Sequence, residues 1–391
     1  MRTGSLAWDV PREVDVARQT SSMLPDLVLF ALIALPLTVP VLDLPLPETA
    51  SLAMVGIAWL RRPAMPTPRP RWFPWLLVLL LGILGLSTLV NHVDGTRRLG
   101  HMVIYAMLAL TLSSGRIHRL AAARGLGLGL ALGAASAVVN AAYPVFETGY
   151  AGRLTGWFYD PNVAGYELTV LGAVALTGAR HGIRRTVGMV ALTAVVLLTF
   201  SRTSLVALLL GAVWLLVRRL GRLWMAVGLA GIAAYALNRV SPDWKLWGPF
   251  AGREGSDELR ARILQDERAQ VALHPWIGNG AGTSKVTLGP EQTFFFHSSY
   301  LGLRNEAGWV GLVLFLALLG LVLLRLLRLP PDERHPWHEA SLVMLAVVGM
   351  SLGEVFLELP AAIAIGLGMR HVIAPHELRP SDRTESPDHV F

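Results

Sequence analysis

Two side chains stand out because their chemistry is unusual for their apolar surroundings. His297 follows three phenylalanines and precedes Ser298 and Ser299. An imidazole titrates near neutrality and therefore suits proton transfer, although a hydrogen-bonded interfacial histidine would fit the same pattern. Arg202 lies in a short polar segment between two apolar runs. Its guanidinium either extends to the membrane surface or binds a phosphate group through paired hydrogen bonds, with Ser201 as a further donor.

Two other polar positions precede or lie within apolar helices. In Gly156-Trp157-Phe158-Tyr159-Asp160-Pro161-Asn162, Asp160 suits a helix N-cap and Pro161 the first helical turn. The aromatic residues are also typical of a membrane-interface belt, so a capped, anchored helix start is one interpretation. Glu306 lies inside an apolar run and is costly there unless Arg304 or another outer arginine pairs with it.

A polar stretch over 240–298 separates these motifs. Residues 257–273 predict an amphipathic helix that His274-Pro275 ends, followed by a flexible glycine-rich turn. Four acidic residues on this helix could bind a metal, but a solvated helix face is the favoured interpretation: Asp257, Glu258, Asp266 and Glu267. The glycine run is not expected to bind a nucleotide, because no βαβ pattern surrounds it.

The elements that must position these residues are helices in a membrane. The 391 residues are 53% hydrophobic and 16% charged, and the mean hydropathy is +0.50. These values exclude an ordinary soluble protein and a disordered chain, and the absence of cysteine excludes disulfides and thiolate sites. The net charge of +7 resides in arginines between hydrophobic runs, so nucleic acid is not the expected partner.

Apolar runs predict an all-α, polytopic membrane protein with about twelve transmembrane helices. The expected helices lie near 24–42, 50–60, 72–90, 98–114, 120–143, 163–179, 185–200, 203–217, 222–239, 308–328, 338–357 and 360–373. Alternate loops are rich in arginine, which makes them cytoplasmic by the positive-inside rule.

This topology predicts the organisation of the chain. We expect a cytoplasmic tail at 1–23, nine helices within 24–239, an extracytoplasmic loop at 240–298, three helices within 299–373 and a second cytoplasmic tail at 374–391. The arginine, histidine and aspartate motifs then face the same, outer side of the membrane. No cleavable signal peptide is expected at the start of the chain.

Together the motifs resemble the O-antigen ligase and O-antigen polymerase superfamily. The resemblance covers roughly 155–325 and rests on Asp160-Pro161-Asn162, Ser201-Arg202, His274-Pro275 with Gly278-x-Gly280, and above all His297-x-x-Tyr300-Leu301-x₄-Glu306-x-Gly308-x-x-Gly311. It implies a bacterial inner-membrane glycosyltransferase. Its members transfer a glycan from a polyprenyl diphosphate outside the inner membrane, without a metal or another cofactor.

The resemblance also implies roles for individual residues. His297 stands at the position of the histidine that deprotonates the acceptor hydroxyl, and Arg202 at that of an arginine that binds the donor diphosphate. A second loop arginine is expected before His274-Pro275; Arg260 has the better spacing and Arg262 is the alternative. Asp160, Asn162, Ser201, Tyr300 and Glu306 are the supporting residues.

Four functions follow, of which one is favoured. The first is an O-antigen ligase that moves preassembled glycan from undecaprenyl diphosphate to the lipid A-core oligosaccharide, with inversion. A polymerase that joins lipid-linked repeat units is the alternative within the superfamily. A secondary transporter would use buried acids such as Glu167, Glu354 and Glu358. A non-enzymatic scaffold for polysaccharide assembly is the least favoured function.

Overall fold

The computed structural model of the protein describes residues 12–39, 44–63, 69–143, 145, 150, 152–179, 182–217, 224–229, 231–232, 254–289 and 292–375. Within them the chain is mostly helical. The longer helices are α1 (Arg12–Ile33), α2 (Leu46–Trp59), α3 (Trp72–Val90), α4 (Thr96–Leu112), α5 (Arg119–Ala142), α6 (Pro161–Ala175), α7 (Ile183–Leu198), α8 (Arg202–Val217), α10 (Glu254–Leu273), α11 (Ser299–Leu327), α12 (Pro336–Val348) and α13 (Leu359–Ile373). Short 3₁₀ turns cover Gly156–Phe158 and Leu176–Gly178.

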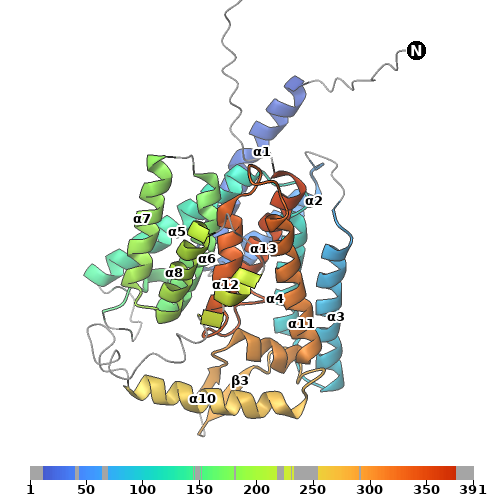
Figure 1. The fold of residues 1–391 in the computed structure, drawn as a ribbon, viewed down its shortest axis with the longest axis vertical. Helices are drawn as coiled ribbons and strands as arrows, with labels where there is room; N and C mark the ends of the chain where they lie inside the picture. Colours follow the sequence, from blue (N-terminus) through green and yellow to red (C-terminus); the bar gives the residue numbers. More distant parts are fainter. Residues whose placement is uncertain are drawn as a thin grey trace, which may run out of the picture.

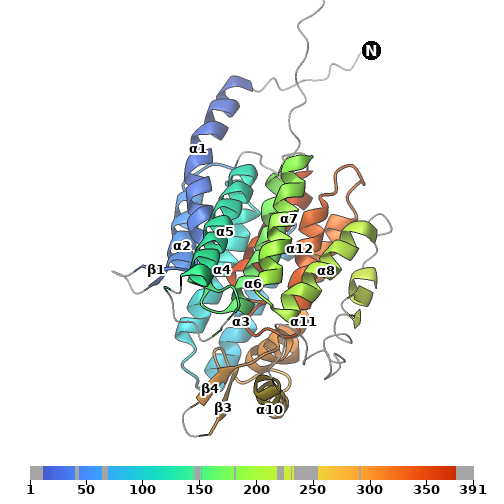
Figure 2. The same ribbon diagram turned by 90° about the vertical axis from the view of Figure 1, so that its left-hand side faces the viewer.

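The helices form one bundle of roughly parallel elements, with α10 crossing one end of it (Figures 1 and 2). Among the described residues α3, α5 and α11 are both long and apolar enough to cross a membrane. Shorter apolar helices include α8, α12 and α13. The protein is therefore a helical membrane protein, and a count of about twelve spans stays a prediction.

Small residues let the helices of this bundle approach closely. On α5, Gly125 and Gly129 lie one turn apart and face α1. A Cβ atom at either position would stand 2.3 Å from a backbone oxygen of α1, that of Leu27 or Ala31. This small-x-x-x-small spacing is typical of helix pairs in membranes, where association depends on close packing.

Three parts of the fold differ from the sequence prediction. The expected helix over 338–357 ends at Val348, and residues 349–358, here called the bridging loop, are not helical. The expected helix at 308 begins nine residues earlier, at Ser299, where Ser298 caps it. The expected first helix at 24–42 runs instead over Arg12–Ile33, and Thr38–Val39 (β1) pairs with Leu44–Pro45 (β2) after it. Most of the ninth expected helix lies outside the described residues.

The polar stretch before α11 builds a small layer at one end of the bundle. α10 covers the predicted helix at 257–273 and is followed by a hairpin of β3 (Lys285–Leu288) and β4 (Gln292–Phe295), which pairs Lys285 with Phe295. Ile263 and Val271 of α10 pack against Val286 and Phe296 in a separate hydrophobic cluster. These contacts fix α10 on the hairpin, and the hairpin leads directly into His297 and α11 (Figure 2).

A break in α11 holds this layer to the bundle. At Gly308 the backbone turns to φ 65°, and the carbonyls of Asn305 and Glu306 accept hydrogen bonds from the N–H groups of Asn279 and Gly280 instead of from their own helix. Trp309 N–H in turn donates to the carbonyl of Pro275. Residues 274–282, here called the His-Pro segment, therefore replace the hydrogen bonds that α11 lacks. The glycine-rich turn predicted to be flexible is firmly bonded.

Substitution of Gly308 by Ala should destabilise the protein by about 2 kcal/mol or more. A Cβ atom there would meet the carbonyl oxygen of Trp276 at 2.1 Å in a backbone conformation that only glycine adopts easily. Gly320→Ala in the same helix is the matched control, because nothing lies within 4 Å of its Cβ position. Thermal unfolding of the two detergent-purified variants checks this; equal midpoints would contradict it.

Candidate active site

A pocket brings together residues from four separate parts of the chain. Its empty volume is about 350 Å³, and we call it the arginine pocket. It is lined by Asn162 of α6, by the α7–α8 turn and first turn of α8 (Phe200, Ser201, Arg202, Thr203 and Ser204), by Arg260 of α10, and by Ser351 and Leu352 of the bridging loop. Two arginines and several hydroxyls converge there, and no carboxylate from the described part of the chain lines it. Such a site suits an anion with several oxygens.

Arg202 is held at the pocket by a tight turn between two helices. The turn passes through Phe200 at φ 47°, after which α8 begins at Arg202 itself. Ser204 donates a hydrogen bond to the Ser201 hydroxyl at 3.0 Å, and the Ser201 N–H donates to Thr199. Arg202 and the start of α8 therefore lie at the same pocket, and a guanidinium and a helix N-terminus both favour a negative charge.

α10 presents Arg260 and Arg262 to different surroundings. Arg260 lines the pocket. The side chain of Arg262 is 67% exposed and bonds to Glu258, one turn away on the solvent side, at 2.6 Å. The structure thus places Arg260, and not Arg262, beside Arg202.

The aspartate motif begins α6 next to this pocket. Asp160 caps the helix by accepting the Asn162 N–H at 2.6 Å, as the sequence predicted, and Tyr150 donates to its other oxygen. Arg153 donates to the Asn162 side chain at 3.1 Å. Because these bonds fix the start of α6, the Asn162 side chain is held at the pocket wall.

His297 lies between α10 and the start of α11. Its backbone N–H donates to Glu267 at 2.5 Å. Burial lowers the pKa of the imidazole below its usual value, and the positive charge of Arg260 lowers it further, whereas backbone contacts and the negative charge of Asp160 oppose this shift. His297 therefore shares an electrostatic environment with Arg260 and Asp160 and favours its neutral form, in which it can accept a proton.

The bridging loop connects the His297 segment with the arginine pocket. The Ser299 hydroxyl donates to the carbonyl of Leu352 and accepts the N–H of Val355. Gly353 lies so close to the Phe296 carbonyl that a Cβ atom would stand 1.7 Å from its oxygen. Sequence analysis missed this loop because residues 338–357 form one nearly continuous apolar run. The only signal was the short Ser351-Leu352-Gly353-Glu354 interruption.

Backbone strain gathers in the same segments. Four non-glycine residues of the described chain have positive φ, namely His92, Tyr159, Phe200 and Glu354. Tyr159 directly precedes Asp160, Phe200 lines the pocket and Glu354 belongs to the bridging loop. Such conformations cost about 1–3 kcal/mol each and are concentrated at functional sites in proteins generally.

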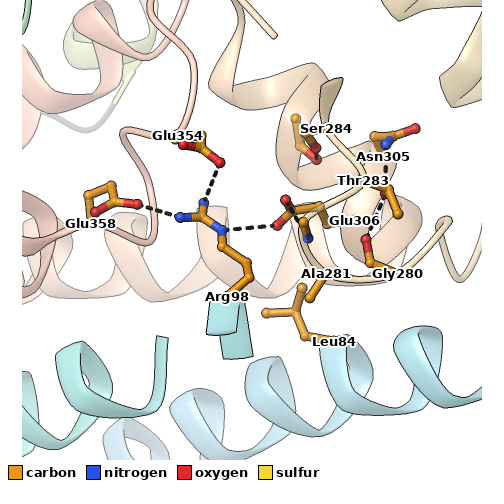
Figure 3. A network of polar contacts seen from close by, with 12 residues as sticks. Leu84, Arg98, Gly280, Ala281, Thr283, Ser284, Asn305, Glu306, Glu354 and Glu358 are labelled. Carbon is orange, nitrogen blue, oxygen red and sulfur yellow. Dashed lines mark hydrogen bonds and ion pairs between the residues drawn. The ribbon is translucent and has the colours of Figure 1, made fainter. Parts of the chain in front are cut away.

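Like His297 and Asp160, the remaining predicted site residues are not among those that line the arginine pocket. The Tyr300 hydroxyl donates to the carbonyl of Ala346, and its ring packs edge-on against Phe356. Glu306 accepts the N–H of Gly282 and pairs with Arg98, which also pairs with Glu354 and Glu358 (Figure 3). The expected partner of Glu306 is thus an outer arginine, Arg98. Arg304 stacks instead on Trp309, with its guanidinium carbon 4.2 Å from the ring centre.

The acidic residues of α10 do not all behave as predicted. Glu258 is 68% exposed, as a solvated helix face requires. Glu267 is fully buried, which is contrary to that interpretation. Among the described residues no group of three His, Asp or Glu side chains is arranged to hold a metal ion.

The site and the bundle define a class: a helical membrane protein with a polar, arginine-containing pocket at one end. Comparison with protein families identifies the class further, because the sequence model described as O-antigen ligase matches residues 187–316. This range includes Arg202, Arg260, His297 and Glu306. The chain thus carries the domain of the O-antigen ligase superfamily over this part, and the resemblance inferred from its motifs is confirmed. A search of curated proteins gives no match.

Removal of Arg98 should destabilise the protein by about 3–5 kcal/mol, because Glu306 would keep a buried charge without its cation. Arg98→Ala should therefore lower the unfolding temperature of the purified protein strongly. Arg98→Ala combined with Glu306→Gln should recover part of the loss. Arg304→Ala at the same end of the bundle is the control and should cost about 1 kcal/mol. Equal effects of Arg98→Ala and Arg304→Ala would refute the buried pairing.

Proposed function

We propose that this protein is an O-antigen ligase. It transfers preassembled O-antigen from undecaprenyl diphosphate to the lipid A-core oligosaccharide at the periplasmic face of the bacterial inner membrane. The observation that carries the proposal is the meeting of Arg202 and Arg260 in one pocket, with His297 in the electrostatic environment of Arg260. The match to the O-antigen ligase family over residues 187–316 supports the same activity.

The diphosphate of the donor binds in the arginine pocket. Arg202 and Arg260 offer planar guanidinium groups that pair with phosphate oxygens, and Ser201 and Asn162 provide neutral polar groups. When the bond between the sugar and the diphosphate breaks, negative charge grows on the leaving phosphate. Fixed cations stabilise that charge without reorganising, and this is a large contribution to catalysis.

His297 activates the acceptor. The neutral imidazole takes the proton of an acceptor hydroxyl while the oxygen attacks the anomeric carbon of the donor sugar. The new glycosidic bond forms as the bond to the diphosphate breaks, so attack from the opposite side inverts the configuration. General base catalysis of this kind contributes about 10²–10⁴ in rate. Asp160 favours the protonated imidazole that results.

The membrane topology follows from the distribution of arginines. We propose that residues 1–23 and 374–391 lie in the cytoplasm, and that 240–298, with α10 and the hairpin, lies in the periplasm between nine helices before it and three after it. The apolar body of the chain contacts membrane lipids. No nucleic acid, metal or other cofactor takes part.

A polymerase is the alternative, since it would use the same donor and differ in its acceptor. Purified protein should be given an undecaprenyl diphosphate-linked glycan with either lipid A-core or a second lipid-linked unit. A product with lipid A-core supports ligation, and a product only with the second unit would reject it. Uptake by proteoliposomes that persists in His297→Ala would favour a secondary transporter.

Arginine substitutions test the pocket. Arg260→Ala should reduce transfer by about 10²-fold or more, because a preorganised charge at the leaving group is lost. Arg202→Lys should also impair turnover, because an ammonium cannot reproduce the planar guanidinium. Arg262→Ala is the matched control on the same helix and should stay close to wild type. Product formation at equal protein amounts checks this. If Arg262→Ala loses activity while Arg260→Ala keeps it, Arg262 and not Arg260 is the second arginine that binds the diphosphate.

The dependence of the rate on pH tests His297. Its lowered pKa predicts that the base form persists down to below pH 6.5 and is lost at more acidic pH. His297→Ala should abolish transfer while the protein remains folded in the membrane. Arg260→Gln removes a nearby positive charge and should move the acidic limb of the remaining activity to higher pH. The measurement is the transfer rate with saturating donor from pH 5 to 9. If the acidic limb of Arg260→Gln lies at the same pH as in wild type, the charge of Arg260 does not act on His297.

A further inference from the structure

Three residues along one face of α10 are buried against the hairpin layer. Ile263, Glu267 and Val271 are spaced four residues apart, and all three side chains are buried. Ile263 and Val271 pack on Val286 and Phe296 of the hairpin layer. Arg260 lies one turn before Ile263 and lines the arginine pocket. A carboxylate at the centre of an otherwise apolar contact is costly and therefore calls for a specific partner.

That partner is the backbone of His297. One carboxylate oxygen of Glu267 accepts the His297 N–H at 2.5 Å, and the other oxygen is buried with no hydrogen-bond partner among the described residues. A backbone amide needs only one acceptor, which a glutamine or a water could supply. A carboxylate at this position holds the peptide that carries the imidazole, and it differs from those acceptors because its charge depends on pH.

We infer that Glu267 is a positioning residue for His297, which fixes the imidazole relative to Arg260 through α10. This inference rests on the proposed function of His297 as the base. A single rigid helix then sets the distance between the group that binds the leaving diphosphate and the group that deprotonates the acceptor. A misplacement of about 1 Å can lower the rate by about 10²-fold, so a fixed distance between these two groups favours catalysis.

The ionisation of Glu267 supports this role. Burial raises the pKa of its carboxyl to about 7, against the opposing effects of the His297 N–H and of Arg268. Around His297 itself, the charges of Arg260 and Asp160 act on the imidazole. On β3, the ammonium of Lys285 lies 5.2 Å from the centre of the Phe295 ring, two residues before His297. Near neutral pH, loss of the Glu267 proton strengthens the bond to His297, because an ionised acceptor binds an N–H more strongly.

The experiment compares Glu267→Ala and Glu267→Gln with Glu258→Gln, an exposed position on the same helix. Glu267→Ala should lower kcat by about 10- to 100-fold with little change in the KM for the donor, because Arg202 and Arg260 remain. Glu267→Gln keeps an acceptor oxygen and should recover much of kcat. The wild-type rate should rise in two steps with pH, one below 6.5 from His297 and one at about 7 from Glu267. Glu267→Gln should lack the second step.

The outcomes separate this inference from the proposed function. If the wild-type protein makes no glycan product, the proposed function fails. If wild type is active and Glu267→Gln has the same two-step profile, Glu267 does not position His297 through its charge and the inference is overturned. The same holds if folded Glu267→Ala retains the kcat of Glu258→Gln. Should Glu267→Ala fail to fold, the pH profile of Glu267→Gln decides.

Discussion

The break in α11 is the constraint on which the site depends. A helix interrupted at Gly308 leaves backbone groups that cost several kcal/mol each when they are buried without partners. The His-Pro segment satisfies them, through Asn279, Gly280 and the carbonyl of Pro275. This exchange ties the end of α10 to α11 by main-chain bonds. The positions of Arg260 and His297 on either side of that junction therefore follow from backbone geometry, which side-chain substitutions on the surface of α10 leave intact.

Two electrostatic centres of opposite character lie at this end of the bundle. The described residues that line the arginine pocket include two arginines and no carboxylate, while Arg98 is surrounded by Glu306, Glu354 and Glu358. The bridging loop contributes to both, through Ser351 and Leu352 at the first and Glu354 at the second. These three acids pair with Arg98, and none of them is among the residues that line the arginine pocket. The bridging loop thus contributes to both centres, while the acids stay paired with Arg98.

Local sequence signals predicted much of the fold and several residues that the structure places at the candidate site. Apolar runs located most helices, and the Asp160-Pro161 pair predicted the start of α6, because capping and hydropathy are properties of neighbouring residues. The bridging loop was missed because its backbone is held by Ser299, which lies far away in sequence. Glu267 was assigned to solvent because its partner is a backbone N–H, which no side-chain pattern reveals. The choice between Arg260 and Arg262 likewise required the orientation of α10 on the hairpin.

The polar groups that line the pocket are better suited to an anion than to a divalent cation. A divalent cation in such a site needs oxygen ligands with negative charge, usually Asp or Glu. The residues that line the pocket offer one amide, several hydroxyls and two guanidinium groups, and the guanidinium groups would repel a second cation. They also arrive from separate elements, α8 and α10, each fixed by its own contacts. An anion with several oxygens can bind both arginines at once. In the proposed reaction, two cations held by different elements meet the leaving group, where negative charge grows as the bond to the sugar breaks.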